Sequence, residues 1–591
     1  MRDFFKSVFA TITGLFLFTI ITSVIGVFII IGIGAALSSG SKQKVEVKAN
    51  SVLKLNFDKP ITERSRNNPF ENVPGFPGQP SSLGLIEIRE SLNKAAKDEN
   101  IKGVYLELGS LSGGYASLEE IRTSLIKFKT SKKFIIAYAE MMSEKDYYLA
   151  SVADEIYLNP AGGMDFNGLS SNYTFFKGLF DKLDIKPEIF RVGEYKSAVE
   201  PFFRTNMSDA SKLQTLSFLN SIQNHNWENI SKSRDIPVSE LKKIADSLYA
   251  SEPEDALKYK LITNVGYKDE ALNSIRKKLK ITEEKEKINF IQINKYIQNI
   301  DEDDTDGKNR IAVIIASGDI VSGDSENNVI SSDNLVEQIK KARLDKKIKA
   351  IVLRINSPGG SAMASDVIWR EIELAKKAKP IVASMSDVAA SGGYYIAMGC
   401  DSIVAEPNTI TGSIGVFGLM FNIEDMLKNK LGVTIDGVKT NAHASIGQRP
   451  LDDFEKRFIQ KSVNKTYDKF TQKAAEGRKM SWEDLKKVAS GRVWSGAEAK
   501  DVGLIDVFGG LEDAIKLAAR LAKIKENDYQ VRYLPRQKEF VEELFSKMND
   551  DVQDRIFIKH FGDMAPYIKQ VKELEKYKGV QLRMPYILNL K

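Results

Sequence analysis

The sequence predicts an α/β protein in which two tandem copies of one domain follow an N-terminal transmembrane helix. Three observations lead to this fold class. Residues 7–41 carry no charged side chain, the remaining chain resembles itself at a nearly constant spacing, and each copy alternates β-branched strands with amphipathic helices. Alternation of this kind is typical of βαβ units, in which helices cover a parallel sheet.

The N-terminal apolar run extends from Val8 to Leu37. It is longer than the ~20 residues that a helix needs to cross a bilayer, and longer than the roughly 7–15 apolar residues of a cleavable signal peptide. We therefore expect residues 1–45 to form a cytoplasmic stub and an uncleaved signal anchor that contacts membrane lipid through residues 8–37. A buried helix of a soluble core is the alternative. No second run of this length follows, so we expect the remaining chain to lie outside the cytoplasm.

The repeat is visible in short matching segments. IKGVYLEL at 101–108 resembles IKAIVLRI at 348–355, an offset of 247, and at the same offset YYLA (147–150) matches YYIA (394–397). A period of roughly 250 residues is far longer than a solenoid unit of about 20–50, so it indicates two copies of a whole domain. We expect a stub and anchor (1–45), a first copy (46–300), a second copy (308–525) and a helical tail (526–591) with a final strand at 584–591.

Each copy has the same plan of elements, most clearly in the second. The β-branched strand IAVIIASG begins at Ile311 and precedes an amphipathic helix expected at 331–345. The apolar strand KAIVLRI, a helix at 361–378 and the strand PIVASM follow in order. The acidic, aperiodic stretch 301–307 between the copies is typical of a linker.

Two glycine-containing turns in the second copy could carry chemistry. In RINSPGG an apolar strand ends in Pro358, Gly359 and Gly360, and glycines at such a turn let backbone N–H groups face a ligand. In SDVAASGGYYIA, Ser391 follows a strand and precedes Gly392 and an expected helix. A serine at a helix start gains a positive dipole and neighbouring N–H groups, as a nucleophile requires. Ser391 could equally be an ordinary helix cap.

A nucleophilic serine needs a base, and two candidates are visible. His443 lies in the second copy, although no acidic residue that would orient it is evident. Lys196 lies in the first copy, and the offset of 247 places it opposite His443. A lysine acts as a base only if burial lowers its pKa by several units. The neighbouring Tyr195 and Phe202 permit such burial, so both candidates stay open on these grounds.

The segments RVGEYKSAVEPF (191–202), SPGG and SDVAASGGYYIA together resemble the long form of the signal peptide peptidase A family, also called protease IV. The similarity spans both copies and the N-terminal anchor. It implies two Clp/crotonase-type α/β domains and a Ser/Lys dyad in which Ser391 is the nucleophile and Lys196 the general base. It also implies that Ser413 hydrogen-bonds the lysine. The N–H groups of Gly359 or Gly360 and of Gly392 are then the expected oxyanion hole.

The two copies differ in a way that supports this division of roles. The residue that matches Ser391 in the first copy is Glu144, so the first copy keeps the lysine and lacks the serine. Each copy alone is therefore incomplete, and the chain would need both.

The resemblance also implies a biological role. Members of the family are membrane-bound endopeptidases that degrade cleaved signal peptides, which are short, apolar and retained in the membrane. We accordingly expect a single-pass protein of the bacterial inner membrane with its bulk on the periplasmic side. The family forms ring- or bowl-like oligomers, so a homo-oligomer, a tetramer by this resemblance, is expected. The Pro- and Gly-rich loop at 63–84 is a candidate for contact with lipid or for the substrate entrance.

Composition excludes several other classes. One cysteine, Cys400, forbids an intramolecular disulfide and is expected in the core. Three separated histidines argue against a His-rich metal site, and neither a metal nor a cofactor is expected. A net charge of +6 over 591 residues is too dilute to indicate nucleic acid. Two alternatives remain: a crotonase-type acyl-CoA enzyme, which needs no serine here, and a membrane-tethered scaffold that has lost catalysis.

Overall fold

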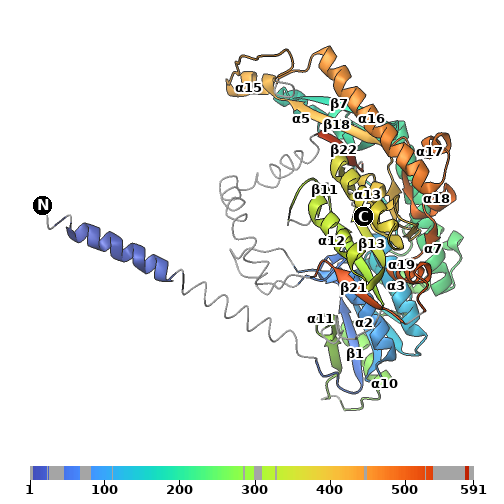
Figure 1. Cartoon of the computed structure of the whole chain (residues 1–591). Helices are drawn as coiled ribbons and strands as arrows, with labels where there is room; N and C mark the ends of the chain where they lie inside the picture. Colours follow the sequence, from blue (N-terminus) through green and yellow to red (C-terminus); the bar gives the residue numbers. More distant parts are fainter. Residues whose placement is uncertain are drawn as a thin grey trace.

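The computed structural model describes most of the chain in several ranges. These are residues 4, 6–22, 24, 45–66, 81–109, 111–283, 286–297, 309–325, 329–444, 449–525, 528–536 and 579–584. Within them the chain forms an α/β body whose two halves follow each other in sequence (Figure 1).

The first half carries the strands and helices of the lysine-bearing copy. They are β1 (Ser51–Asn56), β2 (Ile61–Thr62), β3 (Leu83–Gly84), α2 (Leu85–Lys97), β4 (Ile101–Leu108), α3 (Tyr115–Lys129), β5 (Phe134–Met142), α4 (Glu144–Ala150), β6 (Glu155–Met164), α5 (Lys177–Leu183), β7 (Lys186–Val192), the 3₁₀ turn η1 (Ser197–Val199), α6 (Glu200–Phe203), α7 (Asp209–Arg234), α8 (Val238–Asp246), α9 (Pro253–Lys258), β8 (Asn264–Val265), α10 (Lys268–Leu279), β9 (Asn289–Gln292) and α11 (Ile293–Tyr296).

The second half repeats this plan and ends in the tail. Its elements are β10 (Arg310–Ser317), β11 (Ile320–Val321), β12 (Ile330–Ser331), α12 (Ser332–Leu344), β13 (Ile348–Ser357), β14 (Gly359–Ser361), α13 (Ala362–Lys376), β15 (Ile381–Ala390), α14 (Gly392–Ala397), β16 (Ser402–Ala405), β17 (Ile410–Gly412), β18 (Val416–Asn422), α15 (Glu424–Leu431), α16 (Asp453–Arg478), α17 (Trp482–Val488), β19 (Val493–Ser495), α18 (Gly496–Asp501), β20 (Val507–Phe508), α19 (Leu511–Leu521), β21 (Gln530–Leu534) and β22 (Gly579–Arg583).

Each half is built on its own mainly parallel sheet. The first has the strand order β8-β6-β5-β4-β1-β9. The second has β19-β17-β15-β13-β10-β21, and β16 pairs with β15 while β20 pairs with β16. Strands covered by helices on both faces read as continuous apolar runs, and β4 and β13 have this character, with nearly every residue buried. The predicted α/β class with two repeated domains is therefore confirmed.

A third sheet joins the two halves at the site described below. Its order is β12-β11-β14-β22-β18-β7. β7 comes from the first half and pairs antiparallel with every residue of β18 from the second half. In Figure 1 these strands lie in the upper arm of the molecule, beneath α5 and α15 and beside the long α16. This sheet carries Lys196, four residues after β7, into the second half.

A buried charge network also ties the halves together. The guanidinium of Arg354, on β13, is fully buried and donates to Glu63 (2.8 Å) and Glu120 (2.6 Å), both from the first half. The Asp387 carboxylate of β15 accepts hydrogen bonds from the backbone N–H and hydroxyl of Ser117. Buried charges persist when they are paired and hydrogen-bonded, so these contacts fix how one half sits on the other.

The expected helices at 331–345 and 361–378 appear as α12 and α13. The described parts of the tail are strands rather than helices: β21 joins the second sheet, and β22 joins the third, just before the strand expected at 584–591. The whole 301–307 linker, residues 67–80 of the proline-rich loop, 537–578 and 585–591 lie outside the described residues. The four-domain division stays a prediction.

The structure does not show the expected membrane-spanning helix. Residues 6–22 are helical and their apolar side chains are exposed, whereas 25–44 lie outside the described residues. Among the helices that are described, none is both long and apolar enough to cross a bilayer.

Candidate active site

The side chains of Ser391 and Lys196 meet between the two halves of one chain. Lys196 Nζ donates a hydrogen bond of 2.8 Å to Ser391 Oγ and bonds of 3.0 Å to both the hydroxyl and the carbonyl oxygen of Ser413. All three residues are fully buried. The structure thus brings together the serine, the lysine and the lysine-binding serine that the sequence singled out.

The backbone at Ser391 is strained. Ser391 lies between β15 and α14 with φ 55° and ψ −109°, and left-handed conformations of this kind are uncommon for residues with a Cβ atom. Its side chain makes no capping hydrogen bond to α14, so the alternative of an ordinary helix cap is not supported. Strain of about 1–3 kcal/mol of this type persists where surrounding contacts enforce it, and it often marks functional positions.

Within the described residues, the hydrogen bonds of the Lys196 amine all go to oxygens of serines, and no carboxylate is among their acceptors. Burial lowers the pKa of Lys196 well below its usual value, because the desolvated site disfavours the ammonium form. Two glycines of the second half make room for it. A Cβ atom at Gly491 would lie 2.7 Å from the lysine Cβ, and one at Gly415 would lie 3.0 Å from its Cδ.

Gln214, which the sequence analysis missed, holds the loop that carries the lysine. This buried residue of α7 donates to the Tyr195 carbonyl (3.0 Å) and the Ser197 hydroxyl (2.9 Å). Its own carbonyl accepts from the backbone N–H of Val493 in the second half (3.0 Å). One amide therefore fixes both sides of the lysine loop. No sequence motif distinguishes it from the other polar residues of a helix.

The expected oxyanion glycines, Gly359, Gly360 and Gly392, lie close together next to Ser391, and we call the space between them the glycine hollow. Gly359 and Gly360 have φ values of 103° and 155°, and Gly359 N–H donates to the Ser357 hydroxyl (3.1 Å). A Cβ atom at Gly359 would lie 2.7 Å from the backbone nitrogen of Gly392, so the two glycines face each other closely. A side chain at Gly359 or Gly360 would clash with neighbouring backbone atoms, so only glycine fits at these positions.

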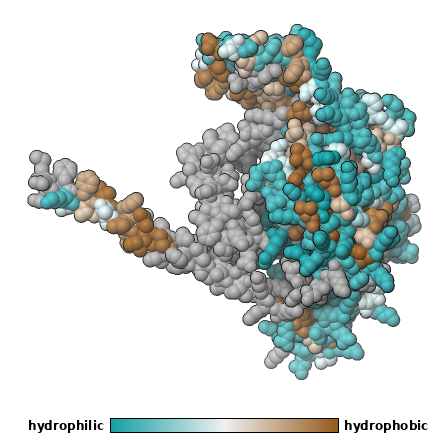
Figure 2. Space-filling model, viewed as in Figure 1, coloured by the Kyte–Doolittle hydropathy of each residue, from teal (hydrophilic) through white to brown (hydrophobic). Residues whose placement is uncertain are grey.

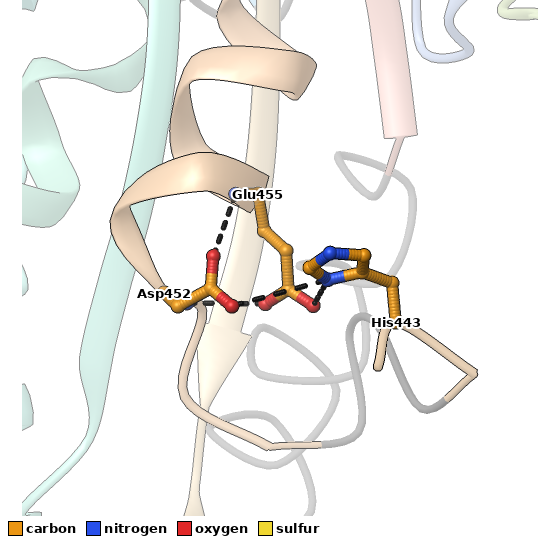
Figure 3. A group of neighbouring side chains, drawn as sticks. All are labelled: His443, Asp452 and Glu455. Carbon is orange, nitrogen blue, oxygen red and sulfur yellow. Dashed lines mark hydrogen bonds and ion pairs between the residues drawn. The ribbon is translucent and has the colours of Figure 1, made fainter. Parts of the chain in front are cut away.

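The alternative base, His443, does not hydrogen-bond Ser391. Its Nδ1 lies 2.8 Å from Glu455 Oε1 at the start of α16, with Asp452 next to both (Figure 3). The Glu455 carboxylate also accepts from Arg449 (2.7 Å), and these hydrogen bonds, His443 first, lower the pKa of Glu455 to about 2.

His443, Asp452 and Glu455 carry ligand atoms within 4.8 Å of one another. The Glu455 carboxylate is already engaged by a guanidinium and caps the helix through Asp452 N–H (3.0 Å), so we interpret the group as a helix cap.

Two further residues that the sequence analysis named, Glu144 and Cys400, are buried in the structure. Glu144, the counterpart of Ser391, is buried and accepts from Gln223 (2.5 Å) and from Gly168 N–H (2.8 Å), and burial raises the pKa of its carboxyl. Cys400 is a buried core residue, as expected, and burial raises the pKa of its thiol.

Comparison with known proteins agrees with this arrangement. The family described as "Peptidase family S49" matches residues 127–282 and 373–525, one segment in each half, and "Clp protease" matches residues 305–410. The chain belongs to peptidase family S49. It is 35% identical to "Protease 4" of Salmonella typhi over 84% of this chain and 82% of that protein. It is 33% identical to "Protease 4" of Haemophilus influenzae over 94% of both chains.

A plant relative extends this relationship. "Serine protease SPPA, chloroplastic" of Arabidopsis thaliana is 36% identical over 76% of this chain and 67% of that protein. Family S49 membership makes the chain a protease, and it confirms the resemblance to the long form of signal peptide peptidase A. The family assignment as a protease takes the place of the alternative that the chain is a crotonase-type acyl-CoA enzyme.

Proposed function

We propose that this S49 protease is a membrane-anchored serine endopeptidase that degrades cleaved signal peptides with a Ser391/Lys196 dyad. The observation that supports it most is the hydrogen bond of 2.8 Å from Lys196 Nζ to Ser391 Oγ, made between two fully buried side chains. A serine is activated by a neighbouring base within this distance.

The lowered pKa of Lys196 lets its amine act as the general base. Once neutral, Nζ accepts the Ser391 proton while Oγ attacks the peptide carbonyl, and the resulting ammonium protonates the leaving amine. Water then hydrolyses the acyl-serine, with the neutral amine again taking a proton. Ser413 holds Nζ in line with Oγ. Because the reactive form is the neutral amine, activity should rise with pH through the lowered pKa of Lys196.

The glycine hollow is the proposed oxyanion hole. The N–H groups of Gly359 or Gly360 and of Gly392 would stabilise the negative charge that develops on the carbonyl oxygen. Loss of one such donor costs on the order of 10²–10³ in rate.

Substrates and location follow from the N-terminal run. Anchoring by residues 8–37 in the bacterial inner membrane, with the body on the periplasmic side, would hold the dyad near short apolar peptides that remain in the bilayer. The names of the relatives support a protease, and the restriction to cleaved signal peptides is the finer part of this proposal.

We also propose that the chains form a head-to-tail homo-oligomer. In the first half, the segment after α5 is β7, which pairs with β18. Its counterpart after α15, residues 433–439, has no regular secondary structure and is exposed, with Val438 completely accessible. The counterpart of β18 in the first half, residues 169–175, also has no regular secondary structure, and no described strand pairs with it.

Repetition of the β7–β18 contact between chains would join residues 433–439 of one chain to residues 169–175 of the next. Figure 2 shows apolar side chains gathered at the tip of the arm that carries α15, where Ile423, Leu431 and Ile435 are exposed.

The decisive experiment uses detergent-solubilised full chain and a fluorogenic apolar peptide. We expect Ser391→Ala and Lys196→Ala to lower kcat by at least about 10³-fold, because each removes a partner in proton transfer. His443→Ala should keep most of the activity and serves as the matched control. Since the dyad forms within one chain, mixing the two inactive variants should restore nothing. A dead His443→Ala with an active Lys196→Ala would reject the dyad, and unchanged activity of Ser391→Ala would favour the scaffold alternative.

A further inference from the structure

The C-terminal strand β22 lies where a peptide substrate would be expected. It is the inner strand between β14 and β18 in the third sheet and runs antiparallel to both (Figure 1). β14 contains the glycines of the hollow, and β18 begins three residues after Ser413. The tail strand β22 therefore pairs with both strands that lie next to the dyad, β14 and β18.

The contacts of Leu582 reach the hollow itself. Leu582 is paired with Gly360, and its carbonyl oxygen would lie 2.1 Å from a Cβ atom at Gly359 and 3.0 Å from one at Gly392. The N–H of Met584 donates to the Pro358 carbonyl (2.7 Å). A backbone carbonyl of the tail thus occupies the space between the glycines that are proposed to bind an oxyanion.

Two side chains of β22 also contact the second half. Leu582 is completely buried in the apolar core of the second half, and the Arg583 guanidinium lies 2.9 Å from the Asp319 carboxylate. Peptides that add a strand to a sheet gain affinity from the backbone and specificity from alternate side chains. The backbone of β22 pairs with β14 and β18, and the side chain of Leu582 packs into the apolar core of the second half.

We propose that β22 is an intramolecular pseudosubstrate of the groove between β14 and β18. The groove accepts an extended chain antiparallel to β14, with a leucine-sized apolar side chain paired with Gly360, and β22 must leave before a substrate enters. This inference rests on the proposed function in naming Ser391 as the nucleophile, but the occupancy of the groove does not depend on catalysis. A groove that is open one-tenth of the time binds a ligand about 10-fold more weakly.

Binding is measured first, because it does not require an active dyad. The probe is a fluorescent peptide with the tail sequence 579–584, GVQLRM, and the proteins are the detergent-solubilised full chain and its Leu582→Asp variant. A buried carboxylate is disfavoured, so the variant should release β22 and bind the peptide at least about 10-fold more tightly than wild type. Leu582→Met, which keeps an apolar side chain of similar volume, should bind like wild type.

The controls separate this inference from the proposed function. A peptide with aspartate in place of its leucine should bind neither protein, and a thermal melt of Leu582→Asp checks that the body stays folded. If the variant and wild type bind the tail peptide equally, β22 is not an occupant of the groove. In the activity arm, Leu582→Asp should lower KM about 10-fold with unchanged kcat. Tighter binding without any peptidase activity would support the inference and reject the proposed function.

Discussion

Two serines in left-handed backbone conformations hold the amine of Lys196. Ser391 and Ser413 have φ values of 55° and 50°, and each oxygen that contacts Nζ belongs to one of them. Strain at both positions is offset by the surrounding sheet: Ser391 N–H donates to the Gly412 carbonyl, and Ser413 N–H donates to that of Arg492. The lysine is thereby placed by neutral dipoles, which bind an uncharged amine without raising its pKa as a carboxylate would.

Burial of Lys196 should lower stability at neutral pH. Between its lowered pKa and about 10.4, the unfolded chain binds one proton more than the folded chain, so stability rises with pH across this window. Lys196→Met removes the proton and keeps the apolar stem. We expect it to raise the Tm at pH 7 by about 3 °C or more, with the difference shrinking as the pH approaches 10. Differential scanning calorimetry across pH, with the exposed Lys242→Met as control, measures this. A difference that does not change with pH would contradict the lowered pKa.

At the residue scale, the sequence singled out the three residues of the proposed site but not how they are held. Ser391, Lys196 and Ser413 stood in recognisable motifs, and the incomplete pair of copies already required partners from both. Gln214 carried no such signal, because its role depends on two backbone groups and one hydroxyl that come together only after folding. Likewise, Leu582 looks like any apolar residue of the tail until its strand is placed beside β14.

At the element scale, the segment between α17 and β19 forms the floor of the lysine pocket. Gly491 has φ 79° and contacts the Lys196 backbone, and Ser490 accepts the Tyr195 N–H at 3.0 Å. A close approach of two backbones requires glycine here, since any Cβ atom would enter the volume of the lysine.

Gly491→Ala should therefore impair catalysis more than stability. Gly503 is a matched control, because its φ is 77° and the nearest atom to an added Cβ, Met480 Sδ, is 3.8 Å away. Both alanines should cost about 1–2 kcal/mol of stability through their left-handed backbone. Only Gly491→Ala should shift the lysine, and a displacement near 1 Å lowers kcat about 10²-fold. Peptidase assays and thermal melts on both variants test this, and equal kcat values would show that Gly491 does not position the amine.

Elements with a clear period were predictable, whereas pairings between distant segments were not. α12 and α13 follow their amphipathic pattern closely, and β10 and β13 are β-branched runs that only a buried parallel sheet accommodates. The third sheet has no such signal. β22 is a short polar and apolar mixture whose strand conformation comes from two partners that lie more than 150 residues earlier.

At the scale of the whole molecule, both halves contribute side chains to the proposed active site. The first half supplies Lys196 through β7, and the second supplies Ser391 and the glycine hollow. The buried contacts of Arg354 with Glu63 and Glu120 keep this docking rigid, because separating them would leave charges unpaired in the interior. The proposed dyad takes one residue from each half, so it requires an interface of fixed geometry between them.

The proposed contact between neighbouring chains repeats the contact that joins the two halves of one chain. The β7–β18 contact uses a strand that follows a short helix with a left-handed cap, and residues 433–439 follow the equivalent helix α15 without a partner strand among the described residues. Because this contact joins two different surfaces, its repetition is heterologous and closes into a ring only if the rotation permits. Exposed apolar residues that no second chain covers are otherwise a liability for aggregation.

Val438→Asp should therefore separate the chains without inactivating them. Val438 is fully exposed in one chain, so a carboxylate there costs little unless a second chain covers it. We expect detergent-solubilised wild type to sediment as an oligomer and the variant as a monomer that still cleaves a soluble peptide, since Lys196 and Ser391 share one chain. Leu344→Asp, at the exposed end of α12, should leave the assembly intact. Sedimentation velocity decides between the two outcomes: an unchanged oligomer in Val438→Asp would place the contact between chains on another surface.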